Sequence, residues 1–184
     1  MEKGNIMHLE EKTIESNLVF DGHIIKVYQD KALLEDGTTA GRELVVHSGG
    51  VCVVPLTDKN EVIMVEQFRY AFKTPLLEIP AGKLEKGEDP EKAGLRELKE
   101  ETGAECEEFI SLGVCYPTVA YDTEKIHMYL AKGLKFDSQK LDEGEFLDVK
   151  KLTLEKAVEM VMNNELPDAK TQIAILKTAR IMGI

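Results

Sequence analysis

Residues 82–104 read GKLEKGEDPEKAGLRELKEETGA, and this stretch decides more about the fold than any other part of the chain. It combines seven carboxylates with the signals for one helix. Asp89 suits a helix N-cap, Pro90 suits the first helical position, and Gly103 suits the stop. The stretch therefore predicts a helix from Pro90 to Thr102.

One face of this helix is acidic, because it carries Glu97, Glu100 and Glu101. Like charges three or four residues apart cost roughly 0.2–0.5 kcal/mol per pair, and on this face we expect no Lys or Arg between them. A solvated acidic helix is the ordinary interpretation. A bound divalent cation is the alternative, since Mg²⁺ is often held by one or two carboxylates plus substrate phosphates. The core contact is expected from the opposite face, through Leu95, Leu98 and Thr102.

The spacing of residues 82–104 favours a bound cation over a solvated acidic helix. Gly82 is followed by five residues and Glu88, then by seven residues and the run Arg-Glu-Leu-X-Glu-Glu-X-Gly-Ala, residues 96–104. This pattern resembles the Nudix box, the signature of hydrolases that cleave a nucleoside diphosphate linked to another moiety. The resemblance implies the family's α/β fold, a mixed sheet in an α/β/α sandwich.

The resemblance also implies a magnesium site, in which Mn²⁺ can substitute for Mg²⁺. It makes Glu97 and Glu101 direct ligands, while Glu100 ligates or supports the cluster and counts among the catalytic residues. The backbone carbonyl of Ala81 is the family's other common ligand, and Gly82 is expected to let the chain turn tightly there.

Two residues of the box are expected to support the site rather than react. Arg96 should pair with a carboxylate, most readily Glu88, and so tie the loop to the helix, although a direct phosphate contact is also open. Glu88 could instead stand in the outer shell of the metal.

An acidic loop follows the box at residues 142–145, Asp-Glu-Gly-Glu. In the branch of the family that hydrolyses ADP-ribose, the proton acceptor comes from such a loop. The resemblance implies Glu143 as the general base and Glu145 as a ligand of an additional metal. A solvated acidic turn is the alternative.

Substrate contacts are expected from Arg42, Arg69 and Glu78, which resemble positions of the same branch. Arginine suits this task because its planar fork grips phosphate oxygens with two parallel bonds. A lone surface arginine is commonly only solubilising. The branch usually has a proline at the position of Val119, so the loop that selects the leaving group is expected to differ.

Composition indicates a soluble enzyme in the cytoplasm. The 184 residues are 43% hydrophobic and 31% charged, enough for one good core and a small accessory lobe. The net charge of -11 disfavours a nucleic-acid or membrane partner. The three cysteines lack metal-type spacing, and the charged N-terminus has no apolar segment.

Apolar alternation predicts strands on both sides of the box. A boundary near residue 48 separates an N-terminal antiparallel sheet, residues 1–48, from a Nudix hydrolase domain, residues 49–184. Relatives of this layout exchange their N-terminal sheets, so we expect a homodimer in which the sheet contributes to dimerisation and Arg42 to the partner's site. The expected strands are 16–20, 23–34, 42–47, 51–56, 61–68, 76–80, 106–115, 125–131 and 146–149, and the expected closing helices are 154–163 and 169–181.

The sequence thus predicts a Mg²⁺-dependent pyrophosphatase that converts ADP-ribose and water into AMP and ribose 5-phosphate. NADH, FAD or a GDP-sugar are alternative substrates. A catalytically silent module that senses nucleotides is the alternative from another class. The intact set of Glu97, Glu100 and Glu101 argues against it.

Overall fold

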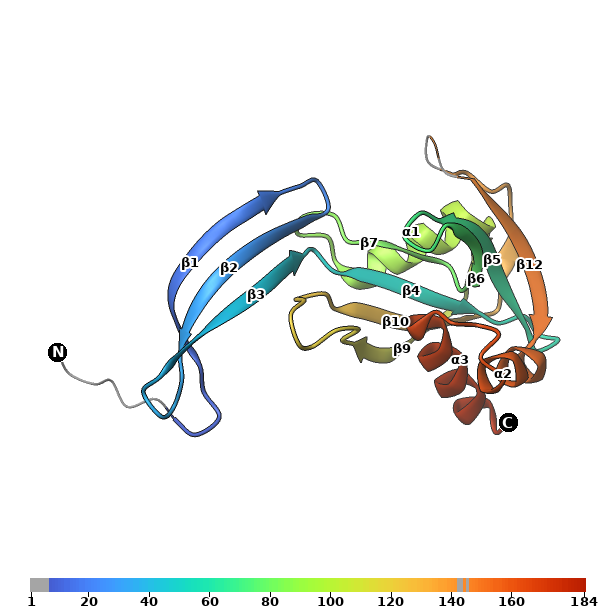
Figure 1. Cartoon of the computed structure of the whole chain (residues 1–184). Helices are drawn as coiled ribbons and strands as arrows, with labels where there is room; N and C mark the ends of the chain where they lie inside the picture. Colours follow the sequence, from blue (N-terminus) through green and yellow to red (C-terminus); the bar gives the residue numbers. More distant parts are fainter. Residues whose placement is uncertain (1–6, 142–143, 145) are drawn as a thin grey trace. The chain divides into compact units, whose positions relative to one another are not determined.

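The computed structural model describes residues 7–141, 144 and 146–184, and within them the chain forms two compact units (Figure 1). One unit comprises residues 7–48 and Thr118–Glu124, and the other comprises Gly49–Pro117 and Lys125–Ile184. The return of residues 118–124 to the first unit was not foreseen. Val45 holds this segment, because its N–H donates to the carbonyl of Tyr121 at 2.7 Å and its carbonyl accepts from Thr123 N–H at 3.0 Å.

The first unit is an antiparallel sheet in the order β1-β2-β3. Its strands are β1 (Lys12–Asp21), β2 (Ile25–Leu33) and β3 (Thr39–His47). β1 is longer than the predicted strand 16–20 because β2 pairs with it from Lys12 to Asp21. All ten residues of β1 are exposed.

The second unit contains two larger sheets and one short strand pair. A mixed sheet has the order β7-β4-β10-β9, with β4 and β10 parallel, and an antiparallel sheet has the order β12-β5-β6. The strands are β4 (Gly50–Pro55), β5 (Glu61–Arg69), β6 (Thr74–Glu78), β7 (Ala81–Lys83), β8 (Ala104–Glu105), β9 (Glu108–Cys115), β10 (Ile126–Lys132), β11 (Lys135–Phe136) and β12 (Leu147–Thr153). The expected strand 76–80 ends earlier, at Glu78, and the short strands β7, β8 and β11 were not predicted.

The three helices of the described residues begin where their capping residues predict. They are α1 (Pro90–Thr102), α2 (Leu154–Met162) and α3 (Ala169–Met182), and their N-caps are Asp89, Thr153 and Asp168. α1 ends at Gly103, whose φ of 68° is the left-handed conformation that favours glycine. Across the described part of the chain, every helix is too short or too polar to cross a membrane.

The core lies on both faces of β4, all of whose residues are buried. Val51 and Val53 belong to a cluster with Leu98 of α1, whereas Cys52 and Val54 belong to a cluster with Ile175 of α3. Alternate residues of a strand point to opposite faces of its sheet, so α1 and α3 cover opposite faces. This arrangement confirms the predicted α/β/α sandwich.

The buried face of α1 differs from the prediction. Leu98 and Thr102 are buried as expected, but Leu95 is 39% exposed and Glu101 only 1% exposed. The buried stripe includes Gly94, where a Cβ atom would lie 2.9 Å from Cζ of Phe109. Gly94 and Glu101 are seven residues apart, which is about two helical turns, so they lie on the same buried face. Leu95 lies at the edge of that face.

Candidate active site

Strand β7 lies against the acidic side of α1 at Gly82. A Cβ atom at Gly82 would lie 1.8 Å from Oε1 of Glu97 and 2.0 Å from its Cδ. The expected reason for this glycine, a tight turn, is wrong, because Gly82 lies in β7 and is not among the glycines with positive φ. Glycine is needed here because the Glu97 carboxylate occupies the space of a side chain.

Glu101 joins the helix to the residue before Gly82. Its Oε2 accepts a hydrogen bond from the backbone N–H of Ala81 at 2.9 Å. Two of the expected metal ligands, Ala81 and Glu101, are therefore adjacent. The side chain of Gln139 donates a hydrogen bond to the backbone carbonyl of Glu101 at 2.6 Å. It thereby satisfies one of the free carbonyls at the C-terminal end of α1.

Three glutamates contact Arg96 of α1, two from the same helix and one from the loop before it. Nη1 of Arg96 donates to Oε1 of Glu97 at 2.8 Å and to Oε2 of Glu100 at 2.9 Å. Its Nε and Nη2 atoms donate to the two oxygens of Glu88 at 3.0 and 3.2 Å. The expected pairing of Arg96 with Glu88 is present. The expectation that no cation lies between the glutamates is wrong, because the Arg96 guanidinium also reaches Glu100, one turn further toward the C-terminus of the helix.

The charges around Arg96 do not balance. Its guanidinium contacts three carboxylates, which exceed it by two negative charges. The pKa of Arg96 is raised, first through its hydrogen bond to Glu88 and then through Glu97 and Glu100. The same hydrogen bond lowers the pKa of Glu88. Three carboxylates beside one guanidinium give this site an excess of acidic groups, which is an environment that favours a cation.

A magnesium ion fits this donor set. Among the residues that the structure describes, no three acidic or metal-binding side chains are gathered into a ready cage. Mg²⁺ does not need one, because one or two carboxylates plus substrate phosphates are enough. The positively charged guanidinium of Arg96 already lies between Glu97 and Glu100, which shows that these two carboxylates can share one cation. Glu97, Glu100, Glu101 and the Ala81 carbonyl would hold the ion.

A second charged group, the Glu78 cluster, comprises Arg69, Glu78, Asp168 and Lys170. Arg69 donates to both oxygens of Glu78, at 2.6 and 2.7 Å. Lys170 donates to Oε2 of Glu78 at 2.5 Å and lies 3.0 Å from Oδ2 of Asp168. The prediction named Arg69 and Glu78 among the substrate contacts, but it did not foresee their pairing or the part of Lys170. No sequence signal links Lys170 to Glu78, since 92 residues separate them.

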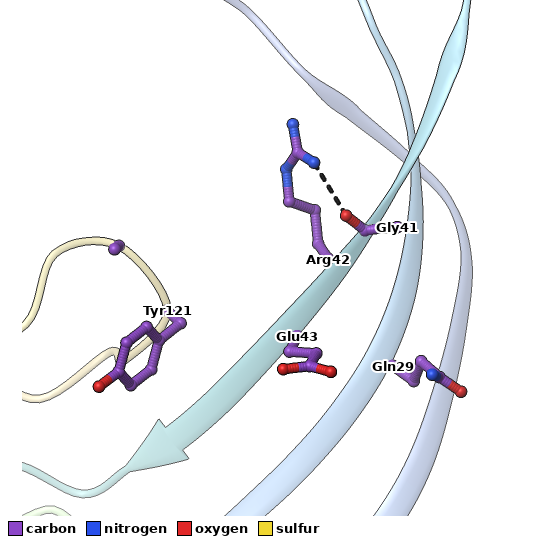
Figure 2. Close-up of a pocket in the computed structure, with 6 residues that line it drawn as sticks. Gln29, Gly41, Arg42, Glu43 and Tyr121 are labelled. Atoms are coloured by element: carbon purple, nitrogen blue, oxygen red, sulfur yellow. Dashed lines mark hydrogen bonds between the residues drawn. The ribbon is translucent and has the colours of Figure 1, made fainter.

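Arg42 lies in the first unit, beside a hollow of about 450 Å³ (Figure 2). Figure 2 shows its guanidinium turned toward Gly41, whose carbonyl accepts a hydrogen bond at 2.8 Å. Its other nitrogens donate to the carboxylate of Glu11 at 2.7 and 2.5 Å. The hollow is lined by Gln29, Gly41, Arg42, Glu43, Ala120 and Tyr121.

Comparison with known proteins decides the family of this chain. The model of the NUDIX domain matches residues 46–174, which include the whole segment built around Gly82 and α1. The chain belongs to the Nudix family. The predicted membership and the predicted enzyme class, a Nudix hydrolase, are confirmed.

Two relatives and one solved structure match this chain over most of their length. The chain is 45% identical to a "Methanol dehydrogenase activator" of Bacillus methanolicus over 168 residues, covering 90% of this chain and 91% of that one. It is 43% identical to an "ADP-ribose pyrophosphatase" of Bacillus subtilis over 169 residues, covering 91% of each. A crystal structure titled "ADP compounds hydrolase" superposes with a TM-score of 0.84 at 19% identity over 95% of each chain, which shows the shared fold.

Two expected residues of the Nudix site lie outside the described residues. They are Glu143, the expected general base, and Glu145, the expected ligand of an additional metal. The Nudix box and the preceding Ala81 thus form two groups of contacts, Ala81 with Glu101 and Arg96 with Glu88 and Glu100. Glu97 joins them, because it lies against Gly82 and also accepts from Arg96.

Proposed function

We propose that the protein hydrolyses the diphosphate bond of ADP-ribose or a related nucleoside diphosphate sugar, giving AMP and ribose 5-phosphate. The contact of β7 with α1, where Ala81 and Gly82 meet Glu101 and Glu97, carries the proposal. The relative from Bacillus subtilis supports ADP-ribose as the substrate, because it is named an ADP-ribose pyrophosphatase.

The residues of the box prepare the site for a polyanion. When bound, Mg²⁺ neutralises phosphate oxygens and increases the acidity of water. Ala81 N–H keeps the Glu101 carboxylate in place, and Arg96 holds Glu97 and Glu100 while Glu88 anchors its other edge. Because these carboxylates are already held in position, they need not reorganise when the reaction takes place.

In the reaction, a water molecule attacks one phosphorus and the bond from that phosphorus to the bridging oxygen breaks. The proton of the water passes to a carboxylate, for which we propose Glu143, and Glu145 is our proposed ligand of an additional ion. Arg69 and Arg42 are our proposed contacts to the diphosphate and the terminal ribose. We assign Glu78 to holding Arg69, because its buried carboxylate already accepts from Arg69 and Lys170.

Hydrolysis by the purified protein tests this proposal. With Mg²⁺, we expect ADP-ribose to yield AMP and ribose 5-phosphate, which an added phosphatase converts to inorganic phosphate. NADH, FAD and GDP-mannose serve as comparison substrates. Removing the metal with EDTA should abolish turnover and adding Mn²⁺ should restore it.

Two outcomes of the same assay would contradict the proposal in different ways. Binding of ADP-ribose without turnover would favour the nucleotide-sensing module. Faster turnover of another nucleotide would keep the Nudix chemistry and replace the substrate.

We also propose a homodimer built through the first unit. β1 exposes all ten of its residues, and in the described part of this unit no helix packs on the sheet. A sheet normally buries at least one face. Exposed apolar side chains on β1 and the following turn are Ile14, Leu18, Val19, Phe20 and Ile24.

Light scattering on the purified protein measures this assembly. We expect a mass near twice the 20.6 kDa of one chain at micromolar concentration. Replacing Val19, an exposed residue of β1, with glutamate should shift the protein toward the monomer, because a charge in an apolar interface is costly. A wild-type protein that stays at one chain's mass would rule out the dimer.

A further inference from the structure

In the Glu78 cluster, Glu78 has two cationic partners, and one of them, Lys170, also pairs with Asp168. Glu78 is 2% exposed and receives hydrogen bonds from two cations, Arg69 and Lys170. One well-placed cation is sufficient to pair a carboxylate, and each further buried charge costs desolvation. Asp168 balances the second cation, so Glu78 would keep a cationic partner if Arg69 moved away.

The shifts in pKa favour the charged forms of both Glu78 and Lys170, although both side chains are largely buried. Burial by itself raises the pKa of Glu78, but the hydrogen bond from Arg69 and the charge of Lys170 bring the pKa below its ordinary value. Burial lowers the pKa of Lys170, and the carboxylates of Asp168 and Glu78 more than reverse that effect. Lys170 is thus a second charged partner for Glu78, beside Arg69.

Arg69 is the more exposed of the two cations in the cluster. Its side chain is 36% exposed, compared with 12% for Lys170 and 2% for Glu78. The charge of Glu101 in the Nudix box contributes to raising the pKa of Arg69, after the larger effects of Glu78 and Asp168.

Lys170 lies in the first turn of α3, where its largely buried side chain pairs with both Glu78 and Asp168. Asp168, its second partner, caps α3 by accepting from Thr171 N–H at 2.9 Å. Oγ1 of Thr171 accepts from the backbone N–H of Ile79 at 3.1 Å. α3 therefore holds Glu78 and Ile79, the residues that lead into Ala81 and Gly82.

We propose that Lys170 is a positioning residue that acts through Arg69. By pairing with Glu78, it lets Arg69 exchange this carboxylate for a phosphate oxygen of the substrate while Glu78 keeps a counterion. The identity of that substrate rests on the proposed function, but the exchange itself requires only a diphosphate.

The variant K170M tests this role. Without Lys170, Glu78 retains Arg69 as its only strong counterion, so the arginine should bind phosphate less readily. We expect KM for ADP-ribose to rise roughly tenfold, with a smaller change in kcat. K170R, which keeps the charge, should restore KM to within about threefold of wild type. If K170M does not fold, K170Q provides a neutral side chain that can still donate to Glu78.

A double-mutant cycle separates positioning from general stabilisation. In the R69A background, K170M should leave KM unchanged, because the residue through which Lys170 acts is gone. An equal rise in KM with and without Arg69 would overturn the proposal. So would a folded K170M protein with the KM of wild type.

Pyrophosphate binding, measured by calorimetry with Mg²⁺, keeps this test independent of the substrate. We expect roughly tenfold weaker binding by K170M, near wild-type binding by K170R, and no further loss on adding K170M to R69A. Failure of wild type to hydrolyse ADP-ribose would overturn the proposed function alone. Wild-type affinity of K170M for pyrophosphate would overturn the role of Lys170 alone.

Discussion

Glu101→Gln is expected to lower kcat by at least roughly a hundredfold while the protein remains folded. The substitution removes one negative charge from the site that the cation would occupy. A glutamine oxygen can still accept the hydrogen bond that Ala81 N–H gives to Glu101 at 2.9 Å. The half-maximal Mg²⁺ concentration, taken from initial rates of ADP-ribose hydrolysis, should rise together with the loss of kcat.

A matched control and a stability measurement complete this test. Glu91→Gln removes an equal charge from the exposed first turn of the same helix and should leave kcat near wild type. Because Glu101 is only 1% exposed, its amide replacement should lower Tm by a few degrees, about 1 kcal/mol for a chain of this size. Full activity of E101Q would remove this residue from the metal site, and unfolding would give it a structural role.

Gly82→Ala is the second substitution with a large expected effect. The added Cβ would lie 1.8 Å from Oε1 of Glu97, far inside van der Waals contact, so the carboxylate or strand β7 must move. We expect kcat to fall roughly tenfold to a hundredfold, because a misplaced ligand weakens both metal binding and positioning. Overpacking of this kind should cost about 1–3 kcal/mol, measured by urea unfolding.

Lys83→Ala is the control for this strand. It shortens an exposed side chain one residue further along β7 and adds no atom near Glu97. Its kcat, its Mg²⁺ requirement and its unfolding midpoint should match wild type. If Gly82→Ala behaves like this control, the close approach of Glu97 to β7 has no part in catalysis.

Local signals explain why much of the site was predictable. The caps Asp89 and Gly103 and the proline at position 90 set the bounds of α1 through contacts within the helix or next to it. The pairing of Arg96 with Glu88 spans eight residues and depends on the same helix start. Even here the prediction missed that Arg96 also bonds Glu97 and Glu100, because the rotamer of a long side chain is not visible in a sequence.

The sequence by itself determined the Nudix family, the helix of the box and the identity of its acidic residues, because these follow from spacing and local propensity. Only the tertiary structure decided that Glu101 is buried, that Gly82 makes room for Glu97, and that Lys170 meets Glu78 across 92 residues. Contacts between distant segments depend on strand register and on how helices pack on a sheet. Those quantities are set by the whole core together, and no single segment encodes them.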